Sequence, residues 1–407
     1  MKINTLLIAN RGEIACRIAR TARAQGITPV GVHSEADANA LHVREIGRSI
    51  LIGAGPASES YLKIDAVLDA ARQVGADAIH PGYGFLAENP DFANAVEAAG
   101  MIFVGPTGET LDRFGDKASA KDAAIAAGVP VVSGSSGAKS DPGEIAAAVR
   151  EMGFPVLLKA VGGGGGRGQR LVENEATLTQ DIEGALREAK STFGSEGMLL
   201  ERFLQAARHV EVKIAGDGAG HVVHLFERDC TLQRRHQKVI EEVPAWGLPR
   251  TLLDRIASDA VKLGESLNYR GLGTVEFLVA GDEYFFIEVN PRIQVEHPVT
   301  EAITGLDLVA LHLRIAQGAG LGVTQADITC TGHAIEARLY AEDPATNFAP
   351  STGKITTLSL PEGIRIDSGV ASGDEVSPFY DPMIAKLIVH APDRETALAL
   401  LAEALDH

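Results

Sequence analysis

The stretch FIEVNPRIQVEHPVTE, residues 286–301, carries polar residues at every second position of a predicted strand. Glu288, Asn290 and Arg292 would share one face of that strand, because successive side chains point to opposite faces of a sheet. Such a face either lies in water or binds a charged ligand. Carboxylate, amide and guanidinium groups placed together suit a metal ion and an anion, so we favour a ligand site.

A second strand, GTVEFLVA, precedes this one and is separated from it by GDE, which predicts a β-hairpin. A three-residue loop centred on Asp282 would place Glu276 opposite Glu288. The same register pairs apolar residues in a core: Val275, Phe277 and Val279 with Val289, Ile287 and Phe285. Adjacent carboxylates repel unless a cation lies between them, and oxygen ligands suit Mg²⁺ or Mn²⁺. We therefore predict a metal site at Glu276, Glu288 and Asn290.

Five consecutive glycines interrupt the segment PVLLKAVGGGGGRGQRLV. Such a run forms neither a stable helix nor a central strand, but it lets the backbone approach a ligand closely. The spacing matches GxGxxG, yet the strand-like QRLVEN follows where a dinucleotide-binding fold requires a helix. A P-loop is excluded because no GK[ST] follows, and Lys159 precedes the glycines, unlike the lysine of a kinase. We favour a mobile lid over a polyphosphate, with a flexible linker as the alternative.

A cationic run, RRHQK, lies at residues 234–238 beside Glu241 and Glu242. Charge runs are usually solvated surface, but next to a phosphate site this one is a candidate anion clamp.

Composition limits the class of protein. A chain of 407 residues with 45% hydrophobic content can form two to four compact units. A net charge of −17 argues against a nucleic-acid or anionic-membrane partner. The cysteines, Cys16, Cys230 and Cys330, are widely separated and form no CxxC pair, so neither a disulfide framework nor a zinc site is indicated, and a reducing cytoplasm is favoured. We find no signal peptide and no apolar run of membrane-spanning length.

The order of predicted elements indicates several units. Residues 1–115 alternate strands (TLLIAN, TPVGVHS, ADAIH, MIFVG) with helices at 12–25 and 61–74, which predicts an open parallel α/β unit. A smaller unit follows, to about residue 204. Residues 205–326 contain the strand HVEVKIAG, a helix near 252–267 and the hairpin. From about 333 the pattern is α+β, with strands HAIEARLYAED, GKITTLSLP and DPMIAKLIVHA and a final helix.

Many of these motifs occur together, and in order, in one family. IANRGEIACRI, HPGYGFLAEN, GDKASAK, KAVGGGGGRG, RHVEVK, ERDCTLQRRHQKVIEE and IEVNPRIQVEHPVTE closely resemble the biotin carboxylase component of biotin-dependent carboxylases, in the ATP-grasp superfamily. The resemblance implies an α/β and α+β multidomain chain with an ATP-grasp fold. Its parts would be an N-terminal Rossmann-like domain (1–115), an ATP-grasp domain (116–332) with a mobile lid at about 131–204, and a C-terminal α+β domain (333–407).

The resemblance also implies site residues. Contacts to ATP would come from Lys117, Lys159, Gly163, Gly164, Gly165, Gly166, Glu201, Leu204, His209, Gln233, His236 and Leu278. Bicarbonate and biotin would be bound by Lys238, Arg292, Gln294, Val295, Glu296, Arg338 and Tyr83. Among these, Lys238 would face the γ-phosphate and bicarbonate, Glu296 would be the base, and Arg338 would stabilise the biotin enolate. Two Mg²⁺ or Mn²⁺ ions would be held by Glu276, Glu288 and Asn290.

The implied reaction is the ATP-dependent carboxylation of the biotin ureido N1′ by bicarbonate, through carboxyphosphate. The expected partners are a biotinylated carrier, because the chain has no MKM-type attachment segment, and a carboxyltransferase, in a homodimer or larger complex. Two features depart from the family: Gln169 replaces a methionine, and the C-terminal domain ends early. The acceptor stays open among acetyl-CoA, propionyl-CoA, methylcrotonyl-CoA, pyruvate and urea. The alternatives are another ATP-grasp ligase, or a non-catalytic subunit that keeps the fold.

Overall fold

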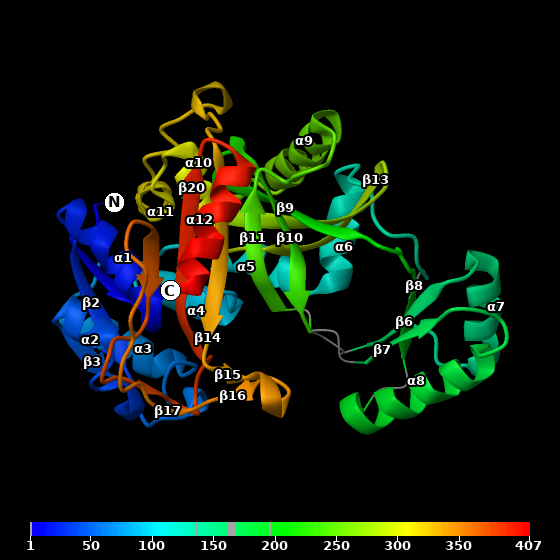
Figure 1. Cartoon of the computed structure of the whole chain (residues 1–407), viewed down its shortest axis with the longest axis horizontal. Helices are drawn as coiled ribbons and strands as arrows, with labels where there is room; N and C mark the ends of the chain where they lie inside the picture. The colour runs from blue at the N-terminus through cyan, green and yellow to red at the C-terminus, as the bar shows by residue number, and fades with distance from the viewer. Residues whose placement is uncertain (1, 136, 162–167, 195–196, 236) are drawn as a thin grey trace.

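The computed structural model describes residues 2–135, 137–161, 168–194, 197–235 and 237–407. It contains three main sheets (Figure 1). One is in the N-terminal part, one is in a small projecting part, and the longest lies between these two parts. Among the described residues, no helix combines the length and apolar character needed to cross a bilayer.

The N-terminal part is a five-stranded sheet in the order β3-β2-β1-β4-β5, and every pairing is parallel, as predicted. Its strands are Thr5–Ile8 (β1), Thr28–His33 (β2), Ser49–Leu51 (β3), Ala78–His80 (β4) and Ile102–Phe103 (β5). Its helices are Gly12–Ala24 (α1), Leu41–Ile46 (α2), Ile64–Val74 (α3), Pro90–Ala98 (α4) and Gly108–Gly115 (α5). Helix α1 buries Ile14, Ile18 and Ala22 against the sheet, because residues four apart share a helix face.

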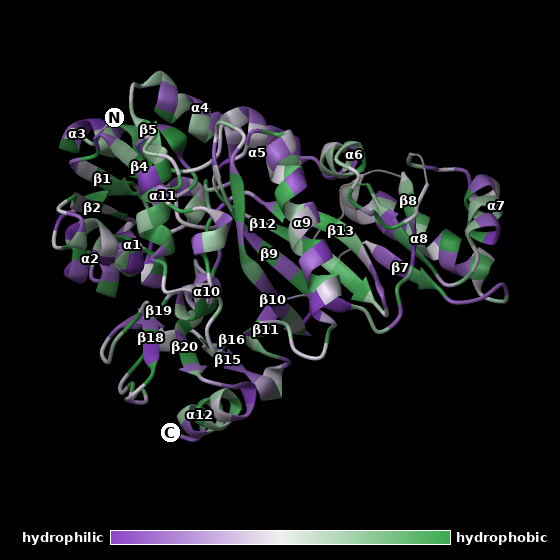
Figure 2. Cartoon of the chain, turned by 90° about the horizontal axis from the view of Figure 1, so that it is seen from above, coloured by the Kyte–Doolittle hydropathy of each residue, from purple (hydrophilic) through white to green (hydrophobic). Residues whose placement is uncertain are grey.

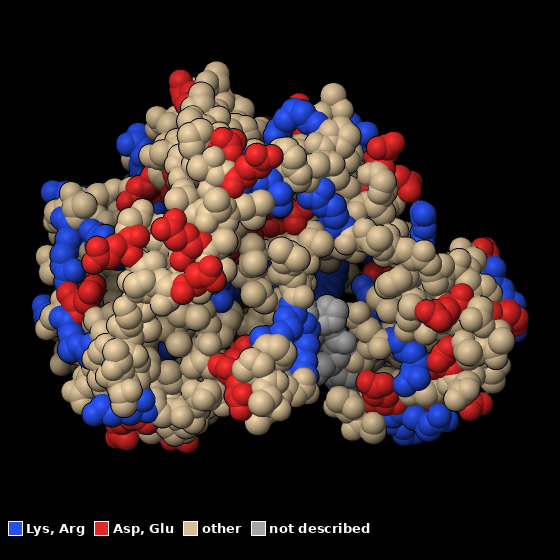
Figure 3. Space-filling model, in the orientation of Figure 1, with Lys and Arg blue, Asp and Glu red and all other residues tan. Residues whose placement is uncertain are grey.

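The small projecting part is an antiparallel sheet in the order β7-β6-β8. Its elements are Pro142–Met152 (α7), Val156–Ala160 (β6), Gln169–Val172 (β7), Leu178–Phe193 (α8) and Met198–Arg202 (β8). Val156, Leu158 and Ala160 alternate along β6 into a core with the two helices, which leaves Leu157 and Lys159 on the other, partly exposed face. Figure 3 shows the molecular surface hollowed between this part and the rest, with Lys and Arg at the edge of the hollow.

An eight-stranded sheet in the order β13-β12-β9-β10-β11-β14-β20-β18 forms the rest of the framework. Its strands are Arg208–Asp217 (β9), Val222–Arg234 (β10), Gln237–Val243 (β11), Arg270–Ala280 (β12), Glu283–Asn290 (β13), His333–Tyr340 (β14), Arg365–Ser368 (β18) and Met383–Ala391 (β20). Its helices are Lys117–Ala126 (α6), Arg250–Ser266 (α9), His297–Thr304 (α10), Leu308–Ala316 (α11) and Arg394–Asp406 (α12). Helices α6 and α9 pack on β9, β12 and β13, and hydrophilic and hydrophobic residues mix along the strands (Figure 2). The C-terminal strands thus continue the sheet that carries the predicted site.

Short elements complete the chain. The remaining strands are Glu342–Asp343 (β15), Ala349–Pro350 (β16), Gly353–Lys354 (β17) and Glu375–Val376 (β19). The 3₁₀ helices are Glu35–Asp37 (η1), Ala57–Glu59 (η2), Gln325–Asp327 (η3) and Pro344–Thr346 (η4). The strand predicted over GKITTLSLP is therefore wrong beyond Lys354, because most of that segment is exposed and buries no alternating face.

The predicted hairpin register is correct on one side of a bulge and wrong on the other. Glu276 pairs with Glu288 as predicted, but the register shifts between Glu276 and Phe277, so that Phe277 pairs with Phe286 instead of Ile287. The shift also pairs Val279 with Tyr284 instead of Phe285. A bulge inserts one residue, which changes the face of every side chain beyond it. Tyr284 and Phe286 are therefore in the core, whereas Phe285 and Ile287 are only partly buried.

Candidate active site

The polar groups of the candidate site come from neighbouring strands of the eight-stranded sheet. Strand β9 presents His209, Glu211 and Lys213 at alternate positions, opposite Leu278, Glu276 and Thr274 of β12. Glu211 also lies opposite Arg228 of β10. Residues that pair directly on adjacent strands point to the same face of the sheet, so these side chains lie together on one face.

Lys238 of β11 connects three carboxylates on this face. Its Nζ lies 2.5 Å from Glu211, 2.9 Å from Glu276 and 2.9 Å from Glu296. Burial alone lowers the pKa of a lysine, but these carboxylates outweigh it and hold the pKa of Lys238 well above its usual value. The group is therefore an ammonium ion at neutral pH, and it can hold anions at this position.

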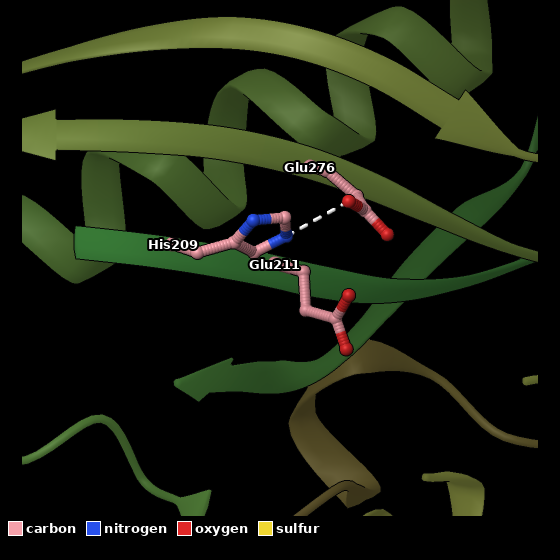
Figure 4. Close-up of side chains that lie close together, drawn as sticks. All are labelled: His209, Glu211 and Glu276. Carbon is pink, nitrogen blue, oxygen red and sulfur yellow. Dashed lines mark ion pairs between the residues drawn. The ribbon is translucent and has the colours of Figure 1, made fainter. Parts of the chain in front are cut away.

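Glu276 and Glu288 differ in charge environment although they are cross-strand partners. Burial raises the pKa of Glu276, but Lys238 and His209, whose Nε2 lies 2.8 Å from Oε2, bring it below its usual value (Figure 4). The pKa of Glu288 is raised, by burial and then by the charge of Glu276. Glu276 is thus ionised, and its charge disfavours the ionised form of Glu288. A cation between the two would stabilise both carboxylates, so the pair fits a hard divalent ion.

Asn290 offers less to such an ion in this conformation. Its Nδ2 donates to Glu276 at 2.7 Å, and its Oδ1 accepts from Arg292 at 2.9 Å. Ligand atoms of His209, Glu211 and Glu276, and of Glu211, Cys230 and Glu296, also lie within 4.8 Å of one another. Because Lys238 already contacts both groups, we read them as carboxylates neutralised by an ammonium ion and not as additional metal sites.

Glu296 lies between two cations at the start of α10. Its Oε1 accepts from Lys238 at 2.9 Å, and its Oε2 accepts from Arg338 of β14 at 3.1 Å. Burial raises the pKa of Glu296, but Lys238, Arg338 and Arg228 together hold it below its usual value. The carboxylate is therefore charged at neutral pH and accepts protons weakly until a ligand changes this balance.

Arg338 has a second carboxylate partner. Its Nη2 lies 2.6 Å from Glu241, which is fully buried. Burial raises the pKa of Glu241 to about 7, even though Arg338 opposes that shift. A single guanidinium therefore faces Glu241 and Glu296 at once, and it stays charged.

Arg292, Gln294, Val295 and Glu296, which the resemblance implies as bicarbonate or biotin contacts, lie in one turn after β13, residues 292–296. Arg292 contacts Glu88, and the buried side-chain oxygen of Gln294 accepts from Arg228 and Thr274. The Gln294 side chain thus already has protein partners, so the backbone of the turn is what can donate hydrogen bonds to a ligand.

Tyr83 reaches the same region through other groups. Its hydroxyl donates to Glu13, and Lys386 lies 3.1 Å from Glu13 and donates to the Val295 carbonyl at 2.8 Å. Burial raises the pKa of Glu13, although Lys386 opposes the shift.

The predicted nucleotide contacts come from the small projecting part and from the eight-stranded sheet and its helices. Lys159 and Glu201 form an ion pair on the partly exposed face of the small sheet, and Lys121 lies 3.8 Å from Glu201. Leu204 lines a cavity of about 410 Å³ with Phe154 and Arg202 among its other walls. The remaining described residues are placed as follows: Lys117 is exposed at the start of α6, Gln233 donates to the Cys230 carbonyl at 2.7 Å, and Leu278 is cross-strand from His209. Gly163, Gly164, Gly165, Gly166 and His236 lie outside the described residues.

Several residues of the site were not predicted from the sequence. Glu211 could have been, because the alternation in RHVEVK is the signal that identified Glu288 and Asn290. Arg228, Glu241 and Glu13 carry no comparable local signal. They enter the site only through strand pairing and domain contacts over long sequence separations.

Comparisons with known proteins identify the family. The family Biotin carboxylase, N-terminal domain matches residues 2–111, Carbamoyl-phosphate synthase L chain, ATP binding domain matches residues 116–324, and Biotin carboxylase C-terminal domain matches residues 336–407. The biotin carboxylase of Halalkalibacterium halodurans is 50% identical over 98% of this chain and 89% of its own. The mitochondrial methylcrotonoyl-CoA carboxylase subunit alpha of Dictyostelium discoideum is 48% identical over 99% of this chain, which spans 58% of that relative.

Solved structures show the same similarity. A Campylobacter jejuni biotin carboxylase in complex with βγ-ATP superposes with a TM-score of 0.93 at 44% identity, covering 100% of this chain and 91% of the other. The biotin carboxylase domain dimer of Hydrogenobacter thermophilus 2-oxoglutarate carboxylase, with MgADP, ADP and bicarbonate, gives a TM-score of 0.92 at 44% identity over 100% and 90%. The fold is thus the ATP-grasp fold that the motifs predicted, and the chain belongs to the biotin carboxylase family.

Proposed function

We propose that this chain carboxylates the ureido N1′ of biotin with bicarbonate and ATP, the first half-reaction of a biotin-dependent carboxylase. The observation that carries the proposal is the arrangement around Glu296, a buried carboxylate held between Lys238 and Arg338. An acid–base group with a cation on either side suits a reaction in which two anions, bicarbonate and the biotin enolate, must be made and held.

The first step activates bicarbonate, which is a poor electrophile. Glu296 takes the bicarbonate proton, a bicarbonate oxygen attacks the γ-phosphorus, and the bond from that phosphorus to ADP breaks, giving carboxyphosphate and ADP. Lys238 stabilises the charge that spreads over the transferred phosphoryl group. Arg292 and the backbone of Gln294 and Val295 would hold the bicarbonate in place.

The second step uses the released carbon dioxide. Carboxyphosphate breaks into CO₂ and phosphate, and N1′ of biotin loses its proton to that phosphate and attacks CO₂. The enolate formed on the way needs a fixed cation, and Arg338 is placed to provide it. Tyr83 would contact biotin on the side of the N-terminal part.

The nucleotide would lie in the hollow between the small sheet and the eight-stranded sheet. Lys117, Lys159, His209, Gln233, His236 and Leu278, with the glycines at 163–166, are the proposed contacts, and Glu201 and Leu204 would lie near the base. Divalent ions, Mg²⁺ or Mn²⁺, would neutralise phosphate oxygens there, held by Glu276 and Glu288, with Asn290 able to join after rotation of its amide.

Domain limits, partners and location belong to the same proposal. The division into 1–115, 116–332 (with a lid at about 131–204) and 333–407 is supported by family matches that end at 111, 324 and 407. We propose a biotinylated carrier as the donor of biotin, a carboxyltransferase as the next catalyst, a homodimer or larger complex, and the cytoplasm. The free thiols of Cys16, Cys230 and Cys330 support a reducing compartment.

The test is ADP formation by the purified chain at fixed MgATP, with bicarbonate and free biotin added separately and together. We expect ADP formation that requires bicarbonate and rises further with biotin. ADP formation that needs an amine or another carboxylate would indicate a different ATP-grasp ligase. Nucleotide binding without turnover under any condition would indicate a non-catalytic subunit.

A further inference from the structure

The turn from Arg292 to Glu296 has its carbonyl groups bound by side-chain donors, three of them fully buried. Nζ of Lys213 donates to the Arg292 carbonyl at 2.9 Å, and Nζ of Lys386 donates to the Val295 carbonyl at 2.8 Å. The two carbonyls between them are bound as well, that of Ile293 by Arg292 Nη1 at 3.2 Å and that of Gln294 by the ring of His297 at 2.7 Å. Four consecutive carbonyl groups thus accept hydrogen bonds from side chains.

The orientation of the carbonyls determines where the amides point. In a trans peptide the C=O and the N–H of the next residue point in opposite directions. The N–H groups of Val295 and Glu296 are therefore directed away from His297 and Lys386, the buried donors that bind the preceding carbonyls. Within the described chain, they donate none of the backbone hydrogen bonds found outside regular elements. Successive amides turned one way form a concave anion-binding surface.

Lys213 and Lys386 bind the two ends of this turn from different parts of the protein. Lys213 belongs to β9 and Lys386 to β20, and both side chains are fully buried. A fully buried lysine is rare, so its position needs a local explanation. For each of the two, the turn carbonyl is among its few polar contacts.

The two lysines differ in their other partners. Lys213 has no carboxylate within ion-pair distance among the described residues, and its second contact is the Thr274 hydroxyl at 3.3 Å. Burial, with Arg228 and Arg292 nearby, lowers its pKa well below the usual value, but an amine in either state can donate N–H. Lys386 also contacts Glu13 at 3.1 Å, so it connects the turn to the N-terminal part.

We propose that Lys213 and Lys386 are positioning residues that hold the 292–296 turn in the conformation that binds bicarbonate. Both lysines contact the backbone of the turn. They would act on bicarbonate indirectly, through the backbone amides of the turn and through the side chains of Arg292 and Glu296. This inference rests on the proposed function, because it assumes that the anion bound by the turn is bicarbonate.

Lys213 gives the sharper test, because Lys213→Met removes a donor without leaving a buried carboxylate unpaired. We expect the KM for bicarbonate to rise about tenfold, the typical effect of losing one strong hydrogen bond, while the KM for ATP stays unchanged. Lys213→Gln keeps an N–H donor and should give a KM between those of the wild type and Lys213→Met. The control is Lys262→Met, which changes a lysine with a 56% exposed side chain on α9.

Lys386 needs a paired variant, because its loss alone would leave Glu13 buried without a cation. Lys386→Gln combined with Glu13→Gln removes one charge of each sign and leaves Arg365 paired with Asp367. It is compared with Glu13→Gln alone. We expect the double variant to have the higher KM for bicarbonate, with an equal KM for ATP.

The outcomes separate this inference from the proposed function. Wild-type protein without bicarbonate-dependent ADP formation would overturn both. If the wild-type protein is active, two results for Lys213→Met would overturn the inference alone. One is an unchanged KM for bicarbonate, and the other is an equal rise in the KM values for bicarbonate and ATP. Equal bicarbonate KM values for Lys213→Gln and Lys213→Met would also overturn the inference, because they would show that the N–H donor at this position has no effect.

Discussion

Lys238 Nζ and Glu296 Oε1 lie 2.9 Å apart, and the same lysine contacts Glu276 at the same distance. Lys238 therefore links the carboxylate that we assign as the base to one that we assign to the metal. When MgATP binds, a divalent ion and the phosphates would compete for these contacts. The charge balance that keeps Glu296 a weak base in the free protein would then change, so that base strength depends on the bound nucleotide.

Glu296→Gln should suppress both ADP formation and carboxybiotin formation. The amide keeps the size of the side chain but cannot accept the bicarbonate proton, and loss of a positioned base typically lowers a rate about a hundredfold or more. The two products are measured together, with the wild type alongside. ADP formation at the wild-type rate would show that Glu296 does not act on bicarbonate.

Arg338→Ala should lower carboxybiotin formation more than biotin-independent ADP formation. Loss of the cation that meets the enolate costs about a hundredfold in rate. Because Arg338 also contacts Glu296, its loss raises the pKa of that carboxyl. The acidic limb of the pH profile of ADP formation should therefore move to higher pH. Equal losses in both activities, with an unmoved profile, would contradict this division of roles.

Glu288→Gln should weaken metal-dependent turnover and stabilise the metal-free protein. Burial and Glu276 raise the folded-state pKa of Glu288, so at neutral pH its charge opposes folding. Removing that charge raises the melting temperature in the presence of a chelator, whereas turnover falls about a hundredfold and needs more Mg²⁺. A variant with lower stability without metal and normal Mg²⁺ dependence would be inconsistent with a metal-binding pair.

Asp367→Asn should remove part of the acid sensitivity of the fold. Burial raises the pKa of Asp367, but Lys386 and Arg365 outweigh it and lower the pKa from 3.8 to about 2. A lowered folded-state pKa stabilises the protein above the unfolded value, and that stability is lost as the pH falls from about 4 to about 2. The loss at neutral pH should be about 2 kcal/mol in denaturant unfolding. Asp69→Asn, at an exposed ion pair, is the control and should change neither quantity.

The sequence predicted those parts of the site that depend on local alternation. The predicted register holds where Glu276 faces Glu288, on the side of the hairpin away from its loop, up to the bulge. Beyond it, the shifted register moved Phe286 into the core and Ile287 out, and no residue type in the hairpin signals where a bulge will form.

Contacts between distant segments could not be predicted in this way. Glu241 meets Arg338 because β11 pairs with β14, and that pairing depends on the whole sheet. Lys386 lies in the apolar stretch MIAKLIVHA, where nothing local indicates a contact with Val295. The parallel N-terminal unit was predictable because its strands and helices alternate along the chain, each with its own period.

The central claim is that ATP activates bicarbonate by phosphoryl transfer, and oxygen labelling tests it most directly. Bicarbonate labelled with ¹⁸O is turned over with MgATP and biotin, and the phosphate released is analysed by mass spectrometry. The bicarbonate oxygen that attacks the γ-phosphorus stays on phosphorus when carboxyphosphate breaks down. We therefore predict one ¹⁸O in each phosphate formed, in step with carboxybiotin. Phosphate with no label from bicarbonate, at the same yield of carboxybiotin, would contradict the account.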